Sequence, residues 1–164
     1  MTTAQTIALD FDDEMKSTRR LLERVPLDDA HRAYQPHPKS MTLDRLASHV
    51  AELPAWPKFA LESELLEIPA DFKPTIAGSS AELLEIFDRG VEQGRAAILA
   101  ATDDDMLKNW NLKWGGQIVY GGPRPSVLRA FLNHLVHHRA QLGVYLRMNN
   151  IPIPGMYGPS ADEQ

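Results

Sequence analysis

Cysteine is absent from this chain of 164 residues. Its absence excludes a disulfide, a thiolate nucleophile and a cysteine-bound zinc ion, because each of these requires a thiol. A metal ion would therefore have to be held by histidine, carboxylate or water ligands. The chain can supply such ligands, since it has 6 histidines and 22 acidic residues.

Long apolar stretches are also missing. No run approaches the roughly 20 apolar residues that a helix needs to span a bilayer. The polar N-terminus does not have the pattern of a secretory signal peptide. We therefore expect no membrane partner and a cytoplasmic location.

An excess of basic residues is the third absence. The formal net charge is −5, with acidic and basic residues mixed along the chain. A nucleic-acid-binding surface is usually positive because it contacts phosphates, so we expect no nucleic acid partner. The hydrophobic fraction of 43% is that of an ordinary globular protein, and no internal repeat is visible. These features predict a single domain over residues 1–164.

Apolar residues recur at helical spacing in four segments of the chain. Steps of three and four are typical of an amphipathic helix that buries one face in a core. Pro54 and Pro57 interrupt the second segment, where each removes a backbone hydrogen bond, so we expect a kink or an irregular turn there. The predicted helices cover residues 3–23, residues 40 or 42 to 67, residues 80–100 and residues 125–148.

The segment between the third and fourth predicted helices has no helical spacing. Residues 110–114 and 117–120 form two short alternating runs, and Gly115-Gly116 between them favours a tight turn. The predicted fold class is therefore all-α, an up-and-down four-helix bundle or a crossover variant of one. A small β-hairpin or extended insertion precedes its last helix.

The last predicted helix contains three histidines within five residues, His134, His137 and His138. Residues four apart lie on one helical face, so His134 and His138 can direct their rings at a common atom. Two neutral imidazoles at this spacing form half of a transition-metal site. His137 lies on the opposite flank of His134, at an angle to His138 that is poor for sharing one ion.

A third ligand would have to come from elsewhere in the chain. Of the remaining histidines, His31, His37 and His49, only His49 lies within a predicted helix, on its apolar side. It can complete a site only if the bundle brings it near the last helix. The alternative is that all these histidines are core residues with ordinary hydrogen bonds, and spacing alone leaves both interpretations open.

Four sequence blocks carry a resemblance to a known family. They are PHPKSMTL at residues 36–43, LASHVAELP at 46–54, NHLVHHRAQL at 133–142 and IPIPGMYGPSADE at 151–163. In order and spacing they resemble the DinB superfamily of damage-inducible four-helix proteins. The resemblance implies a DinB-like four-helix bundle, usually a homodimer, that holds a divalent metal ion with three histidines. In this sequence they are His49 from the second helix and His134 and His138 from the last, while His137 becomes a packing residue.

Three histidine ligands leave a coordination position open for water or substrate, as in catalytic rather than structural zinc sites. Glu52 lies three residues after His49, on the same side of the predicted helix. It could supply an oxygen ligand or act as a catalytic base. The alternative for Glu52 is an exposed helix carboxylate without a catalytic role.

The resemblance favours a metal-dependent enzyme and leaves its reaction open. DinB-like proteins include transferases and isomerases that use low-molecular-weight thiols such as bacillithiol or mycothiol, as well as metal-dependent hydrolases. We expect a thiol-dependent transferase type with zinc or nickel as the divalent metal ion. Its partners would be a small-molecule substrate of unknown identity and a low-molecular-weight thiol. The alternatives are a hydrolase, a non-catalytic metal-binding stress-response protein, and a structural bundle with core histidines.

Overall fold

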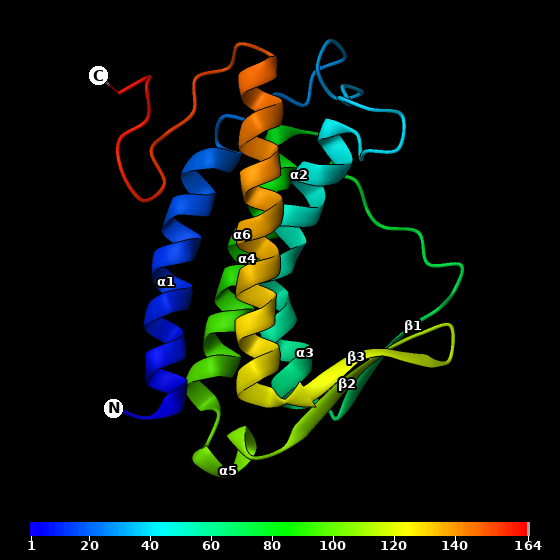
Figure 1. The fold of residues 1–164 in the computed structure, drawn as a ribbon, viewed down its shortest axis with the longest axis vertical. Coiled ribbons are helices and arrows are strands. Elements are labelled where there is room, and N and C mark those ends of the chain that lie inside the picture. The colour runs from blue at the N-terminus through cyan, green and yellow to red at the C-terminus, as the bar shows by residue number, and fades with distance from the viewer. Residues whose placement is uncertain (164) are drawn as a thin grey trace.

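Long helices run side by side along the molecule, and a small sheet projects from one end of them (Figure 1). The computed structural model describes residues 1–163. Helix α1 (Thr3–Leu22) packs against α4 (Ser80–Ala100) and α6 (Arg124–Met148). On the other side of α4 and α6 lie α2 (Leu43–Glu52) and α3 (Trp56–Glu62). Within residues 1–163, no helix is both long and apolar enough to cross a membrane.

Capping residues and apolar stripes explain where the long helices form. The hydroxyl of Thr2 accepts a hydrogen bond from the Gln5 backbone, and the Gln5 side chain accepts one from Thr2, which completes a capping box for α1. Ser79 caps α4 through the backbone N–H of Glu82. The buried faces meet in one core cluster that includes Phe11 of α1 and residues of α2, α4 and α6. The helices predicted over residues 3–23, 80–100 and 125–148 agree with the structure to within one residue at each end.

The prolines divide the second predicted helix as expected. A 3-10 turn, η1 (Leu53–Ala55), separates α2 from α3, and Pro54 lies inside it. This turn packs against α4 where Gly90 and Gly94 lie one helical turn apart. A Cβ atom added at Gly94 would be 2.1 Å from the Pro54 carbonyl oxygen, so this approach requires glycine.

The expected helix over residues 63–67 is wrong. The helix ends at Glu62, and strand β1 (Leu65–Ile68) follows. It pairs in parallel with β2 (Asn109–Trp114), and β2 pairs antiparallel with β3 (Gln117–Pro123). A short apolar run such as residues 65–68 is compatible with a helix or a strand. Here it forms a strand because the backbone of β2 at the edge of the hairpin offers hydrogen-bonding partners.

The β2–β3 hairpin is confirmed, and its turn contains Gly115 and Gly116 with φ of 55° and 83°. Such positive φ values favour glycine, as in the tight turns that join twisted strands. Trp110 of β2 is fully buried against α6 residues such as Phe131, which fixes the hairpin to the helices. The expectation of an all-α chain is therefore corrected to a helix-rich fold with a three-stranded sheet of order β1-β2-β3. Between α4 and β2 lies the short helix α5 (Asp103–Met106).

Candidate metal centre

Helices α2 and α6 bring three histidines together. His49 lies near the end of α2, and His134 and His138 lie one turn apart in the middle of α6. One nitrogen atom from each ring lies within 4.8 Å of the other two. The two helices contact each other directly, so His49 and His134 are neighbours in the fold although 85 residues separate them in the sequence.

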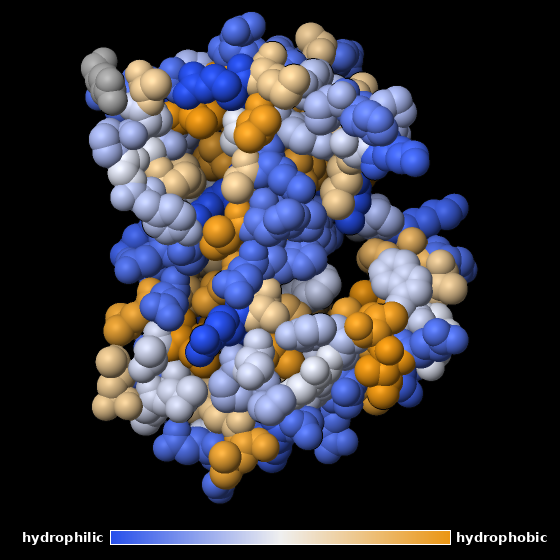
Figure 2. Space-filling view, viewed as in Figure 1, coloured by the Kyte–Doolittle hydropathy of each residue, from blue (hydrophilic) through white to orange (hydrophobic). Residues whose placement is uncertain are grey.

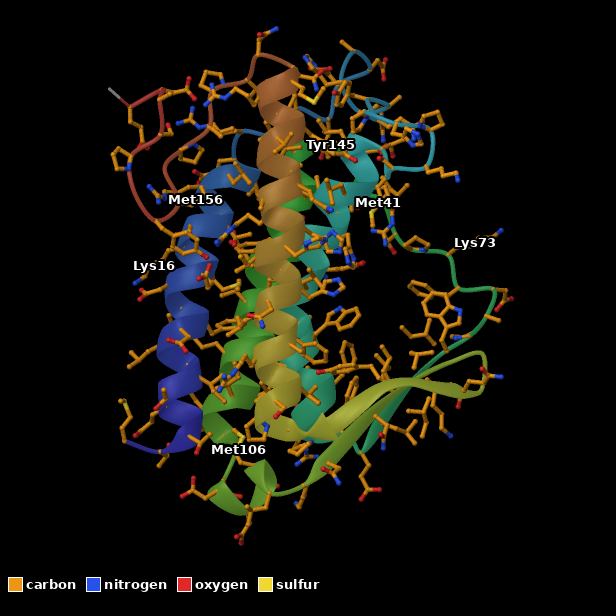
Figure 3. All side chains as sticks on the ribbon, viewed as in Figure 1. Lys16, Met41, Lys73, Met106, Tyr145 and Met156 are labelled. Atoms are coloured by element: carbon orange, nitrogen blue, oxygen red, sulfur yellow. The ribbon has the colours of Figure 1, made fainter. Side chains whose placement is uncertain are left out.

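A hydrogen bond holds the two helices in register above the histidines. The hydroxyl of Tyr145, two turns beyond His138, donates to the Met41 carbonyl oxygen at 3.1 Å. In Figure 3, Tyr145 and Met41 lie at the same end of the molecule, where α6 and the start of α2 run side by side. Their contact adds to the packing between α2 and α6 that places His49 opposite the α6 histidines.

The three rings face one another at short distances. His49 Nε2 and His134 Nε2 are 2.9 Å apart. The ring centroids are 5.1 Å apart for His49 and His134, 4.7 Å for His49 and His138, and 4.6 Å for the pair on α6. Their approach needs neutral rings, because positive charges this close would repel.

Two polar side chains fix the orientation of the histidines. Glu52 Oε1 accepts a hydrogen bond from His49 Nδ1 at 2.6 Å. Gln141 Oε1 accepts one from His138 Nδ1 at 2.8 Å. Each bond places the ring proton on Nδ1, so that Nε2 keeps its lone pair as a potential metal ligand. The same carboxylate oxygen of Glu52 lies 3.5 Å from Arg45 Nη2, one turn before His49.

The local environment keeps the histidines on α6 neutral. Partial loss of water around His134, together with the three neighbouring histidines, lowers its pKa to about 4. Partial burial also lowers the pKa of His138, although its bond to Gln141 opposes the shift. Neutral imidazole is the form that binds a metal ion.

The geometry of the donor set fits a divalent ion. Zinc–nitrogen distances are about 2.0–2.1 Å, so an ion can reach two nitrogen atoms that lie 2.9 Å apart. The group has three nitrogen donors and no thiolate, which suits zinc, nickel, cobalt or iron. Ordinary core histidines explain this arrangement less well, because the three rings approach one another closely although His134 is exposed to solvent.

The other candidates lie outside this group. His137 contacts the edge of His138, with centroids 4.9 Å apart, and its Nε2 is 3.1 Å from Gln141 Nε2. His31 bonds Asp28, and His37 accepts a hydrogen bond from the Lys39 backbone, both in the connection before α2.

Glu52 and Trp56 both contact the histidine group. Glu52 lies on the Nδ1 side of His49, away from the nitrogen that faces His134, so it orients the ring. Trp56 stacks beside His134, with centroids 6.0 Å apart and planes 26° from parallel. A catalytic role for Glu52 stays a prediction, and its position makes a direct metal–oxygen bond less suitable than a bond to His49.

Sequence reasoning missed two parts of the site. Arg45 approaches Glu52 from two turns earlier in α2, and Gln141 orients His138. Both had a signal in helical spacing, since Arg45 is four residues before His49 and Gln141 is three residues after His138. Neither residue has an ordinary metal-ligand side chain, so a search for ligands passes over them.

Comparison with known proteins places the chain in a family. The model of the DinB family matches residues 1–164. The chain belongs to the DinB family. The match to a curated protein is short: the uncharacterized protein YrdA of Bacillus subtilis is 39% identical over 41 residues, which is 25% of each chain.

Solved structures show that the DinB fold extends over nearly the whole chain. A DinB-like protein from Bacillus cereus has a TM-score of 0.71 at 21% identity, covering 93% of this chain and 97% of that one. The DinB-like protein YjoA from Bacillus subtilis has a TM-score of 0.66 at 17% identity, covering 97% and 99%. At these identities the likeness concerns the fold.

Proposed function

We propose that this DinB family protein is a metal-dependent enzyme of the thiol-dependent transferase type, with His49, His134 and His138 as the metal ligands. The observation that supports this proposal is the close approach of three imidazole rings, two of which are oriented by hydrogen bonds at Nδ1. Within residues 1–163 this group has no fourth protein ligand, so a coordination position stays open to a small molecule.

The chain's own residues prepare the site. A bound divalent ion supplies a Lewis acid that favours the deprotonated form of a thiol or water coordinated to it. Glu52 holds the Nδ1 proton of His49 and fixes the ring, and Gln141 does the same for His138. Trp56 stacks beside one side of His134, and His134 stays exposed to solvent.

A hydrolase is the second candidate, and the bonds of Glu52 argue against its simplest form. A hydrolytic base has to accept a proton from water, and in Glu52 only Oε2 remains for this role, because Oε1 faces both His49 and Arg45. We therefore favour a reaction in which the thiol is the nucleophile. Binding of the metal without turnover is the third candidate.

The first experiment is metal analysis of untagged protein, followed by cobalt substitution. We expect one divalent ion per chain, zinc or nickel, and a change in the cobalt spectrum on adding a low-molecular-weight thiol. His49→Ala, His134→Ala and His138→Ala should each abolish metal binding, while His137→Ala is the matched control that retains it. Equal loss in all four variants would reject the ligand assignment. Activity on esters or amides without thiol would favour the hydrolase.

The remaining expectations belong to the same proposal. We propose that α1, α4, α6 and the α2–α3 segment form a four-helix bundle in one domain, and that the chain is a cytoplasmic homodimer. The partners are a small-molecule substrate and a thiol. Light scattering at several protein concentrations tests the dimer, since a monomer at all of them would exclude it.

A further inference from the structure

A cavity of about 390 Å³ opens beside the histidine group. One wall comes from the end of α2, η1 and α3, and the other from β1 and the loop that follows it. In Figure 2 the molecule is indented on the side where the sheet projects from the helices. Its volume is within the range of small-molecule pockets, which runs from about 300 to 1,000 Å³.

Two of the lining residues connect the cavity to the candidate metal centre. Glu52 lines it and bonds His49, and Trp56 lines it and stacks beside His134. A molecule with one end at the histidines therefore has the cavity directly beside it.

The rest of the lining is mainly apolar. Phe59 of α3 and Phe72 of the loop after β1 both line the cavity. They are 42% and 48% exposed, although phenylalanine side chains are usually buried. Leu66 and Ile68 occupy alternate positions of β1 and so share one face of that strand. Apolar side chains left open to solvent at one place commonly mark a binding site.

Basic side chains do not line this cavity among residues 1–163. Lys73 follows Phe72 in the loop but points outward, away from the helices (Figure 3). Lys113 lies beside Glu67 in the sheet, yet only Glu67 contributes to the lining. An anionic group placed here would lose water without gaining a cationic partner, which is unfavourable.

We propose that this cavity binds an uncharged apolar group, such as an aromatic ring or a branched alkyl chain, of a small-molecule substrate whose polar end reaches the histidines. The proposal rests on the proposed function for the polar end. The cavity favours the apolar end of the substrate. A ring or alkyl chain that binds against Phe59, Phe72 and Leu66 removes apolar surface from water.

The test uses small probes of the same shape on metal-free protein, so that it does not depend on the metal. Benzyl alcohol and benzoate are titrated while the methyl signals of Leu66 and Ile68 are followed by NMR. We expect saturable shifts of these signals with benzyl alcohol, and binding of benzoate that is about tenfold weaker because its charge is desolvated. Equal affinity for the two probes, or shifts that leave both residues unaffected, would overturn the proposal.

Matched variants locate the binding. Phe72→Ser should weaken benzyl alcohol binding, whereas Ile76→Ser, an exposed apolar residue outside the lining, should not. Glu67→Lys should reduce the difference in affinity between benzyl alcohol and benzoate, and the nearby Glu64→Lys should leave this difference unchanged. If Phe72→Ser binds like the parent protein, or if both lysine variants behave alike, the cavity is not the binding site.

The two proposals fail in different ways. Protein that binds benzyl alcohol in the cavity but takes up no divalent ion would refute the proposed function alone. Protein that takes up the ion but does not distinguish the probes would refute the cavity proposal alone. With the cobalt form, benzyl mercaptan should bind more tightly than 2-mercaptoethanol if both proposals hold, because only the former carries a ring.

Discussion

Gly94→Ala should destabilise the protein although alanine is the better helix former. The variant adds a methyl group to α4, and its carbon would lie 2.1 Å from the Pro54 carbonyl oxygen and 3.2 Å from the Phe11 ring. The first distance is about 1 Å shorter than the 3.3 Å or so of a close carbon–oxygen contact. Either η1 or α4 must therefore move, and η1 is the turn that directly follows Glu52.

The expected magnitude combines two opposing terms. Replacing glycine by alanine in a helix stabilises it by about 0.5–1 kcal/mol. Overpacking against a backbone that cannot yield costs about 1–3 kcal/mol. The middle values of the two terms predict that the free energy of unfolding of Gly94→Ala falls by about 1 kcal/mol, or a few °C in Tm for a chain of this size.

Gly143→Ala provides the matched control. Gly143 lies inside α6, and an added Cβ would have no neighbouring atom within 4 Å. Only the helix term applies there, so this variant should gain about 0.5–1 kcal/mol. Urea unfolding of both variants, in chelator so that metal binding does not contribute, measures the two changes. If Gly94→Ala is as stable as Gly143→Ala, the close contact between α4 and η1 does not exist as described.

Three further predictions concern the site and its surroundings. Glu52→Ala should weaken metal affinity about 10–100-fold because no side-chain acceptor then orients His49, whereas the exposed Glu85→Ala should not; isothermal titration compares them. In metal-free protein, the free energy of unfolding should decrease as the pH is lowered from about 6.5 to 4. In this range His134 takes up a proton in the unfolded chain but not in the folded protein, where its pKa is about 4; a denaturation midpoint that does not change with pH would refute this prediction. Tyr157→Phe removes hydrogen bonds to Arg139 and Glu14 and should cost about 1 kcal/mol; an unchanged urea midpoint would show that they contribute nothing.

Much of the helical part of the fold could be predicted from the sequence because the relevant signals are local. Caps at Thr2 and Ser79, prolines at the break after α2 and glycines at the hairpin turn each act within a few residues. Strand β1 could not be predicted in this way. Its four residues form a strand because β2, more than 40 residues later, offers them hydrogen-bonding partners.

For the candidate site too, some features followed from the sequence and others only from the tertiary structure. Spacing in α6 by itself determined that His134 and His138 share a face, and the absence of cysteine determined that any metal ligand is nitrogen or oxygen. Only the tertiary structure decided that His49 faces them and that Glu52 bonds His49 from the side opposite His134. It also decided that Phe72 and β1 enclose a cavity beside them. The physical reason is range: helical periodicity acts over one or two turns, whereas these contacts depend on how distant helices and strands pack.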